Sequence, residues 1–227
     1  AAVKSGRISH ERLDASVRRI LAMKVKVGLR TSRLVDLDRA REIVGDSADA
    51  AIARSAADRS ITLVRASALQ LPLARLNKGA RILSVTYAHR ADLGAGVTFD
   101  AELRRTFPAL RSEYVSVDDE RPDFFHLFAI ADSADVILVS SYVAHSSTVT
   151  SIDVPRSFVD FIEELQKRRE HPIILAFGNP YFLQQIPDVG AYVVAWGGFP
   201  VSQAAAARAI LGTIPISGKM PITIPNH

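Results

Sequence analysis

The sequence has 227 residues, of which 48% are hydrophobic, with 28 basic and 24 acidic side chains and a formal net charge of +4. A chain of this length can bury a large core without a covalent staple, and the absence of cysteine excludes disulfides and thiolate metal sites. The basic residues are dispersed and not interleaved with aromatics, which argues against nucleic-acid binding, and no apolar run approaches the length of a membrane span.

Two helices and a linker are expected in the first quarter of the chain. Ser9 is a suitable N-cap for a helical pattern that ends at Gly28. Its apolar stripe is formed by Leu13, Val17, Ile20 and Leu21. Residues 29–46 are mixed and charged, as in a linker with a short helix around 37–44, and Ser47 opens an alanine-rich helix.

From residue 61 short apolar runs alternate with helical ones. The expected strands are 61–65, 81–88, 113–117, 135–142, 172–178, 191–197 and a closing strand within 215–225. The expected helices are 98–107, 123–131, 155–169, 180–185 and 202–211. Runs such as 135–142 are apolar on both sides, as in a parallel sheet that is covered on both faces. The fold class is therefore α/β, a three-layer α/β/α sandwich around a mainly parallel sheet.

Motifs for cofactors and metals are incomplete. Gly94 and Gly96 follow a strand, but Phe99 stands where a dinucleotide loop needs its third glycine. Lys219 follows a glycine as in a P-loop, but Met220 replaces the magnesium-binding Ser or Thr. The six histidines form no H-x-H or H-E-x-x-H arrangement. No cofactor and no metal are expected.

Ligands of open α/β sheets bind beyond the carboxyl ends of the strands, and four residues are expected at that edge. His145 lies in a polar loop after a buried strand, where a solvated surface histidine is the plainer alternative. Asn179 can bond its own backbone and shape the turn before the next helix. Tyr181 and Trp196 follow in the loops after two strands, where packing at the strand ends is the alternative to ligand contact.

Carboxylates give a weaker signal for catalysis. Residues 118–120 are consecutive acids before Arg121-Pro122, as in a charged surface turn. Asp153 lies just after the loop of His145 and could face the same crevice. No G-x-S-x-G nucleophile elbow occurs.

Four segments together resemble a known family. They are "SGRISHERLDASVRRILAMKVKVGL" (5–29), "ARSAADRSITLVRASALQLPL" (53–73), "FGNPYFL" (177–183) and "ILGTIPISGKMPITIP" (210–225). The chain resembles the second half of glycoside hydrolase family 3, with the closer likeness to its two-domain bacterial β-N-acetylglucosaminidase branch. In that family a (β/α)₈ barrel precedes an α/β sandwich. The resemblance implies three regions: 1–29 as the last barrel helix, 30–59 as linker and helix, and 60–227 as the C-terminal sandwich.

The resemblance also implies a function for the longer protein. Its substrate would be a β-linked N-acetylhexosaminide, and the sandwich would have the N-terminal barrel domain of the same protein as its partner. The nucleophilic Asp of the family lies on the barrel. In the β-glucosidase branch the acid/base Glu comes from the sandwich, but the matching stretch "SSYVAHSSTVTSIDVP" (140–155) contains no Glu and no Asp-Arg pair. No catalytic residue is therefore expected in this chain, which opens like the middle of a longer protein.

Two alternatives stay open. One is a β-glucosidase-type family 3 hydrolase in which Asp153 replaces the missing Glu. The other is a stand-alone flavodoxin-like ligand-binding module. The sequence does not decide between a cytoplasmic and an exported protein.

Overall fold

The computed structural model describes residues 1–66, 71–119, 122–143, 154–168 and 171–225. The chain forms two compact units, Ala1–Ala50 and Ala51–His227. No helix among these described residues is long and apolar enough to cross a membrane.

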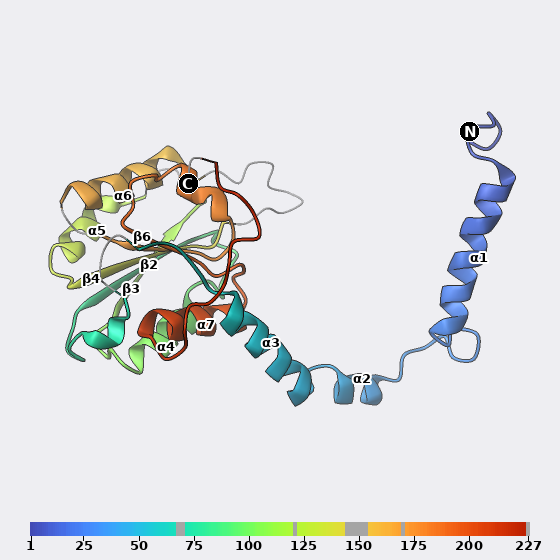
Figure 1. Cartoon of the computed structure of the whole chain (residues 1–227), viewed down its shortest axis with the longest axis horizontal. Helices are drawn as coiled ribbons and strands as arrows, with labels where there is room; N and C mark the ends of the chain where they lie inside the picture. Colours follow the sequence, from blue (N-terminus) through green and yellow to red (C-terminus); the bar gives the residue numbers. More distant parts are fainter. Residues whose placement is uncertain (67–70, 120–121, 144–153, 169–170, 226–227) are drawn as a thin grey trace. The chain divides into compact units, whose positions relative to one another are not determined.

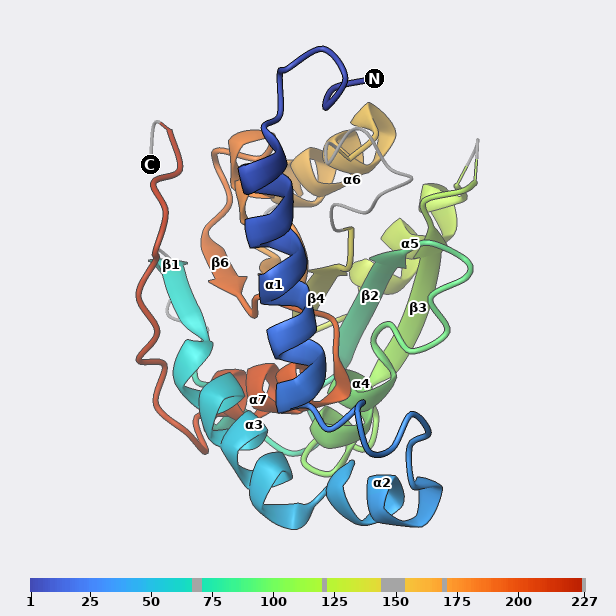
Figure 2. The same ribbon diagram turned by 90° about the vertical axis from the view of Figure 1, so that its right-hand side faces the viewer.

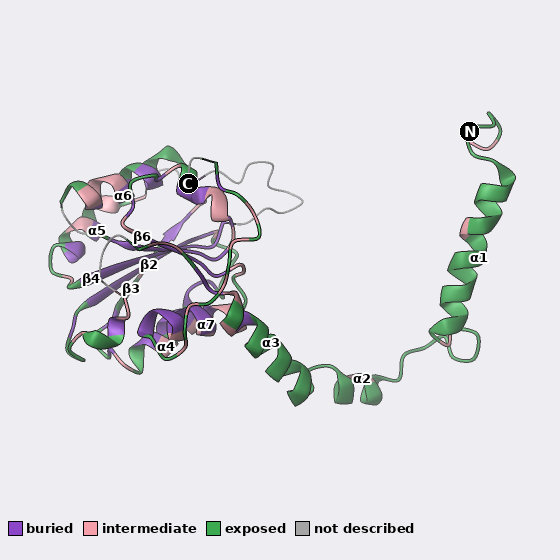
Figure 3. Cartoon of the chain, viewed as in Figure 1, coloured by how far each residue is buried: buried purple, intermediate pink, exposed green. Residues whose placement is uncertain are grey.

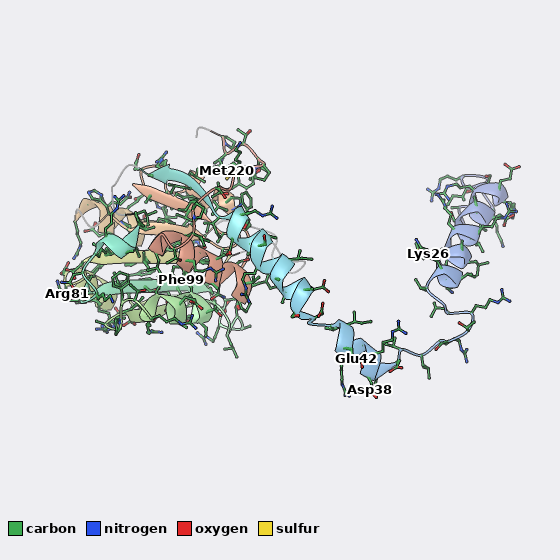
Figure 4. The ribbon with its side chains drawn as sticks, turned by 60° about the horizontal axis from the view of Figure 1, so that its bottom comes forward. Lys26, Asp38, Glu42, Arg81, Phe99 and Met220 are labelled. Carbon is green, nitrogen blue, oxygen red and sulfur yellow. The ribbon has the colours of Figure 1, made fainter. Side chains whose placement is uncertain are left out.

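The first unit is helical, as expected. Helix α1 spans His10–Lys26, α2 spans Leu37–Ile43, and α3, Ser47–Ser60, continues into the second unit. Ser9 caps α1 by accepting a hydrogen bond from the Arg12 amide, and Gly28 follows the helix with a φ of +81°. No residue of α1 is buried (Figure 3). Its exposed apolar side chains are Leu13, Val17, Ile20, Leu21, Met23 and Val25. Helix α2 carries Asp38 and Glu42 on its surface (Figure 4).

The second unit contains a six-stranded sheet in the order β1-β6-β5-β4-β2-β3. The strands are β1 (Thr62–Ala66), β2 (Ile82–Ala88), β3 (Arg111–Ser116), β4 (Val136–Ser141), β5 (Ile173–Ala176) and β6 (Ala191–Val194). All neighbouring pairs are parallel except β1 with β6. The predicted, mainly parallel sheet is confirmed.

Helices cover both faces of the sheet (Figure 1). Helices α4 (Val97–Arg104) and α7 (Pro200–Leu211) lie on one face, and α5 (Phe124–Ala131) and α6 (Arg156–Lys167) lie on the other. Two 3₁₀ turns, η1 (Leu73–Arg75) and η2 (Pro180–Gln184), complete the unit. The three-layer sandwich is therefore confirmed, although the expected helix 180–185 is a 3₁₀ turn.

The core has two halves because successive side chains of each strand point to opposite faces. In β5, Ile173 and Leu175 belong to the cluster under α4 and α7, while Ile174 and Ala176 belong to the cluster under α5 and α6. The expected stripe of α6 is buried in the second cluster: Phe158, Phe161, Ile162 and Leu165. Phe158 stacks on Tyr87 with ring centroids 3.8 Å apart.

The predicted closing strand within 215–225 is wrong, because none of these residues is in a strand. Proline lacks the amide hydrogen that a sheet ladder needs, and Pro215, Pro221 and Pro225 divide the segment. It packs as an irregular strap on the second unit, and Figure 2 shows it running alongside β1. The Gly218 amide donates to the Ile61 carbonyl over 2.9 Å, and Ile224 is only 4% exposed. Met220, labelled in Figure 4, packs against the α5/α6 half of the core.

Close contact at Gly218 makes the strap testable. A Cβ at this position would lie 2.3 Å from the Ser60 carbonyl oxygen and 2.6 Å from that of Ile61, both backbone atoms. Gly218→Ala is expected to lower the free energy of unfolding by about 2 kcal/mol, since overpacked atoms force the backbone to shift. Urea denaturation would measure the change. Gly79→Ala is the control, because its nearest neighbour is a side-chain oxygen at 3.6 Å. Equal stability of the two variants would contradict the docking of the strap.

Candidate functional site

The candidate site is the edge of the sheet where strands β2 to β6 end. The chain passes from β2 outward to β3 and then back across β2 to β4, so the direction of winding reverses between β2 and β4. Doubly wound sheets bind ligands beside such a switch point. The described residues at this edge follow β2 (89–96), β3 (117–119), β4 (142–143), β5 (177–179) and β6 (195–199).

Gln203 of α7 holds two of these loops against the start of α4. Its side chain is 1% exposed, and its Oε1 accepts from the amides of Thr98 and Phe99, each over 3.1 Å. Its Nε2 donates to the carbonyls of Gly94 (2.9 Å) and Gly198 (2.7 Å). One amide thereby satisfies two orphan amides of a helix start and one carbonyl in each loop. The sequence carries no motif for this role, since Gln203 sits in an alanine-rich helix.

Trp196 follows β6 with a φ of +62°, which is uncommon for a residue other than glycine. Its indole Nε1–H donates to the Ser60 carbonyl (2.9 Å) and contacts Thr62 Oγ1 (3.2 Å). The ring is partly buried against the α5/α6 half of the core. The indole nitrogen is thus engaged with the start of β1, and the sugar-binding role of Trp196 stays a prediction.

Asn179 shapes the turn after β5, as expected. Its Oδ1 accepts from the Tyr181 amide over 2.9 Å, and its own amide donates to the Val143 carbonyl over 3.0 Å. Asn179 is buried, while Tyr181 is half-buried and packs against the core. The Tyr192 hydroxyl donates to the Pro180 carbonyl over 3.1 Å. The turn is therefore well anchored, and contact of Asn179 or Tyr181 with a ligand stays a prediction.

Two other expected residues cannot be placed. His145 and Asp153 lie outside the described residues, in the segment 144–153.

A polar cluster that sequence reasoning did not single out joins the loops after β2 and β3. His89 Nδ1 lies 3.0 Å from Asp118 Oδ1, and the Arg90 amide donates to Asp118 Oδ2 over 2.8 Å. Arg90 also pairs with Asp119. The hydrogen bond from His89 and then that from the Arg90 amide lower the pKa of Asp118. The sequence placed Asp118 in a surface turn correctly, but the partner 29 residues away leaves no local pattern.

The chemistry of this described edge is limited. Glycoside hydrolysis by paired carboxylates needs a nucleophile or base and an acid that face one another. Asp118 and Asp119 are instead engaged by His89 and Arg90. Among the described residues, no group of three or more histidine or acidic side chains could hold a metal ion.

Comparison with known proteins fits this arrangement. No protein-family model matches the chain. It is 27% identical to the β-N-acetylglucosaminidase/β-glucosidase of Cellulomonas fimi over 98% of its own length and 40% of that protein. Its structure superposes on a family 3 β-N-acetylglucosaminidase from Paenibacillus with a TM-score of 0.73 and 24% identity, covering 98% of this chain and 41% of that one.

The chain is homologous to the Cellulomonas fimi β-N-acetylglucosaminidase/β-glucosidase. It matches the α/β sandwich of family 3 enzymes in fold, and it spans about 40% of the length of the Cellulomonas relative. A shorter stretch, 35% of the chain, is 38% identical to β-glucosidase C of Emericella nidulans, of which it covers 13%. The resemblance read from the four sequence segments is therefore confirmed at the level of the family and the domain.

Gln203 gives the sharpest stability test of this edge. Gln203→Ala would leave two buried amides and two carbonyls without their partner, and we expect it to lower the free energy of unfolding by about 3 kcal/mol. Gln184→Ala, at an exposed position, is the matched control and should change stability little. If both variants denature at the same urea concentration, Gln203 does not hold the loops.

The Asp118 cluster predicts a dependence on pH. The lowered folded-state pKa means that this stabilisation is complete above the ordinary value of 3.8 and is lost as pH falls through the folded value. Asp118→Asn should therefore flatten the loss of stability below about pH 4, as seen in urea midpoints across the acid range. His89→Ala should flatten it in the same direction. An unchanged acid profile in Asp118→Asn would show that the pair contributes nothing.

Proposed function

We propose that this chain is the C-terminal sandwich domain of a longer glycosidase that hydrolyses β-linked N-acetylhexosaminides. The observation that carries the proposal is the similarity to the Cellulomonas fimi enzyme along almost the whole chain. In this proposal the catalytic groups belong to a barrel domain, and the sandwich supports the active site without being catalytic itself.

The described edge of the sheet is consistent with a domain that supports an active site without carrying the catalytic groups. Its loops are fixed by Gln203, by the turn of Asn179 and by the indole of Trp196. The acids Asp118 and Asp119 are held by a histidine and an arginine of the neighbouring loop. Rigid loops with engaged acids suit one wall of a sugar pocket better than the reaction centre. We assign that wall to the loops at 179–181 and 196–199, and on the sequence prediction also to 142–151, which carries His145.

The exposed apolar stripe of helix α1 argues for a partner domain. A helix with a bare apolar stripe is stable only when the stripe packs against another element. In the proposal α1 is the last barrel helix, with regions 1–29, 30–59 and 60–227 as barrel end, linker and sandwich. The Leu13, Val17 and Ile20 side chains would then pack within the barrel domain.

Two observations favour β-glucosidase activity as a second candidate function. The Cellulomonas relative carries both activities in its name, and the Emericella relative is a β-glucosidase. In that case Asp153 would supply the acid/base group of the sandwich. A stand-alone flavodoxin-like module is the third reading, and the coding sequence upstream of Ala1 discriminates it. A barrel with a "KHFPGHG"-like segment there would favour the hydrolase.

The proposal is tested with two forms of the protein. The full-length protein should hydrolyse a chromogenic β-N-acetylglucosaminide, whereas purified residues 1–227 should release no chromophore above the buffer rate. Turnover by residues 1–227 would overturn the assignment of catalysis to a separate domain.

Substitution of Asp153 separates the two hydrolase readings. In the full-length protein Asp153→Asn should change kcat by less than about tenfold, because Asp153 is not the acid/base group in the proposed function. Removal of a general acid/base typically costs about 10²–10⁴-fold. Asp188→Asn, at an exposed position outside the edge loops, is the control. A loss of 10²-fold or more in Asp153→Asn alone would favour the β-glucosidase reading.

A further inference from the structure

A pocket of about 260 Å³ with a mixed polar and apolar lining lies between α4 and the edge strand β3. It is lined by Thr86, Gly96, Asp100, Arg104, Ser112 and Tyr114, among others. Figure 2 shows α4 crossing below β2 and β3, at the side of the sheet away from β1 and β6. None of the residues predicted to contact substrate lines it.

A chain of hydrogen bonds forms one wall of the pocket. Asp100 projects from α4 and is only 5% exposed. Its Oδ1 accepts from Ser84 Oγ over 2.6 Å and its Oδ2 accepts from Ser112 Oγ, which in turn is bonded by the Arg104 guanidinium. Burial raises the pKa of Asp100, against the lowering effect of the two serine hydroxyls. A buried carboxylate costs free energy unless it is satisfied, so this wall is held in one arrangement.

Thr86 offers an unused hydroxyl to the same pocket. The residue is 4% exposed, lies directly across from Tyr114 in the β2/β3 register, and its hydroxyl makes no hydrogen bond to any other residue that the structure describes. A Cβ on Gly96 would lie 2.3 Å from Thr86 Oγ1, so only glycine leaves space above it. The hydroxyl is therefore open to the pocket and can donate to, or accept from, a group that enters it.

Tyr114 supplies the aromatic side. Its side chain is 47% exposed, and its hydroxyl donates to the His89 carbonyl over 2.7 Å, which fixes the orientation of the ring. A fixed, half-exposed ring presents an apolar face to a ligand that lies against it.

The charges of the lining narrow the class of ligand. The lining carries charges of both signs, Asp100 and Glu113 against Arg104, so it offers no set of like charges for a small anion or a small cation. The start of α4 is no anion site, because Gln203 already accepts from the amides of Thr98 and Phe99. The remaining match is a neutral molecule with several hydroxyls, each able to donate to Asp100 or Thr86 and to accept from Arg104. The pocket is smaller than the roughly 300–1,000 Å³ of drug-sized ligands, so it suits a single ring.

We propose that the pocket between α4 and β3 binds one neutral sugar ring, stacked on Tyr114 and hydrogen-bonded by Thr86 and the Asp100–Arg104 wall. This site follows from the pocket itself and holds whether or not the longer protein is a hydrolase.

Methyl NMR of the full-length protein tests the proposal. Threonine and valine methyl groups would be labelled with carbon-13, and the signals of Thr86 and Val97 assigned by substitution; Val97 also lines the pocket. Both signals should shift and saturate when glucose or N-acetylglucosamine is added. Glucuronate and glucosamine, which carry a charge, should shift them much less. A constant position of both signals with either neutral sugar would overturn the proposal.

Two variants locate the binding. Tyr114→Ala should raise the sugar concentration that half-saturates the shift of the Val97 signal by about tenfold or more, because the stacking face is lost. Thr86→Val keeps the shape of the side chain and removes its hydroxyl, and should raise the half-saturating sugar concentration by about two- to tenfold. Thr106→Val makes the same change outside the pocket and should leave the half-saturating sugar concentration unaltered. Unchanged affinity in both pocket variants would contradict the site, even if sugar binds elsewhere on the protein.

Discussion

The four hydrogen bonds of the Gln203 side chain are the interaction on which the ordered edge of this sheet depends. The side chains of parallel strands that are buried on both faces are mostly apolar and offer few hydrogen-bond partners. The backbone amides and carbonyls of the loops beyond these strands must therefore bond to groups from other elements. Gln203 reaches from α7 to the loops after β2 and β6 and to the first turn of α4. Because one amide satisfies groups from three segments, those segments keep one arrangement. The orientation of α4, and with it the placement of Asp100 opposite Ser84, follows from that arrangement.

The same constraint separates the two kinds of surface on this chain. At the loop edge, polar groups bond to one another: Asn179 to its own turn, Trp196 to Ser60, and Asp118 to His89. On α1 the apolar stripe has no buried residue. The first surface is polar and internally bonded, and the second is apolar and uncovered in the first unit. Nearly the whole chain is similar in sequence to the Cellulomonas fimi enzyme.

Much of the fold could be predicted from local pattern. Continuous apolar runs gave β2, β4 and β5, the spacing of phenylalanines gave α6, and Ser9 and Gly28 gave the ends of α1. The prediction of a closing strand was wrong because it followed the alternating apolar residues of 215–225. Three prolines in this segment lack the amide hydrogens that pairing with a neighbouring strand requires. The long-range contacts could not be predicted. Gln203 meets Gly94 across 109 positions and His89 meets Asp118 across 29, and neither pair leaves a periodic signal. The buried Asp100 looked like an ordinary charge of a helix.

Hydrogen–deuterium exchange of the full-length protein, with and without a non-hydrolysable N-acetylhexosamine analogue, tests the central claim most directly. If the sandwich forms one wall of the sugar pocket, the amides of residues 177–181 and 195–199 should exchange more slowly when the analogue is bound, while those of α5 and α6 on the outer layer should not change. Slower exchange confined to regions outside residues 1–227 would contradict the account.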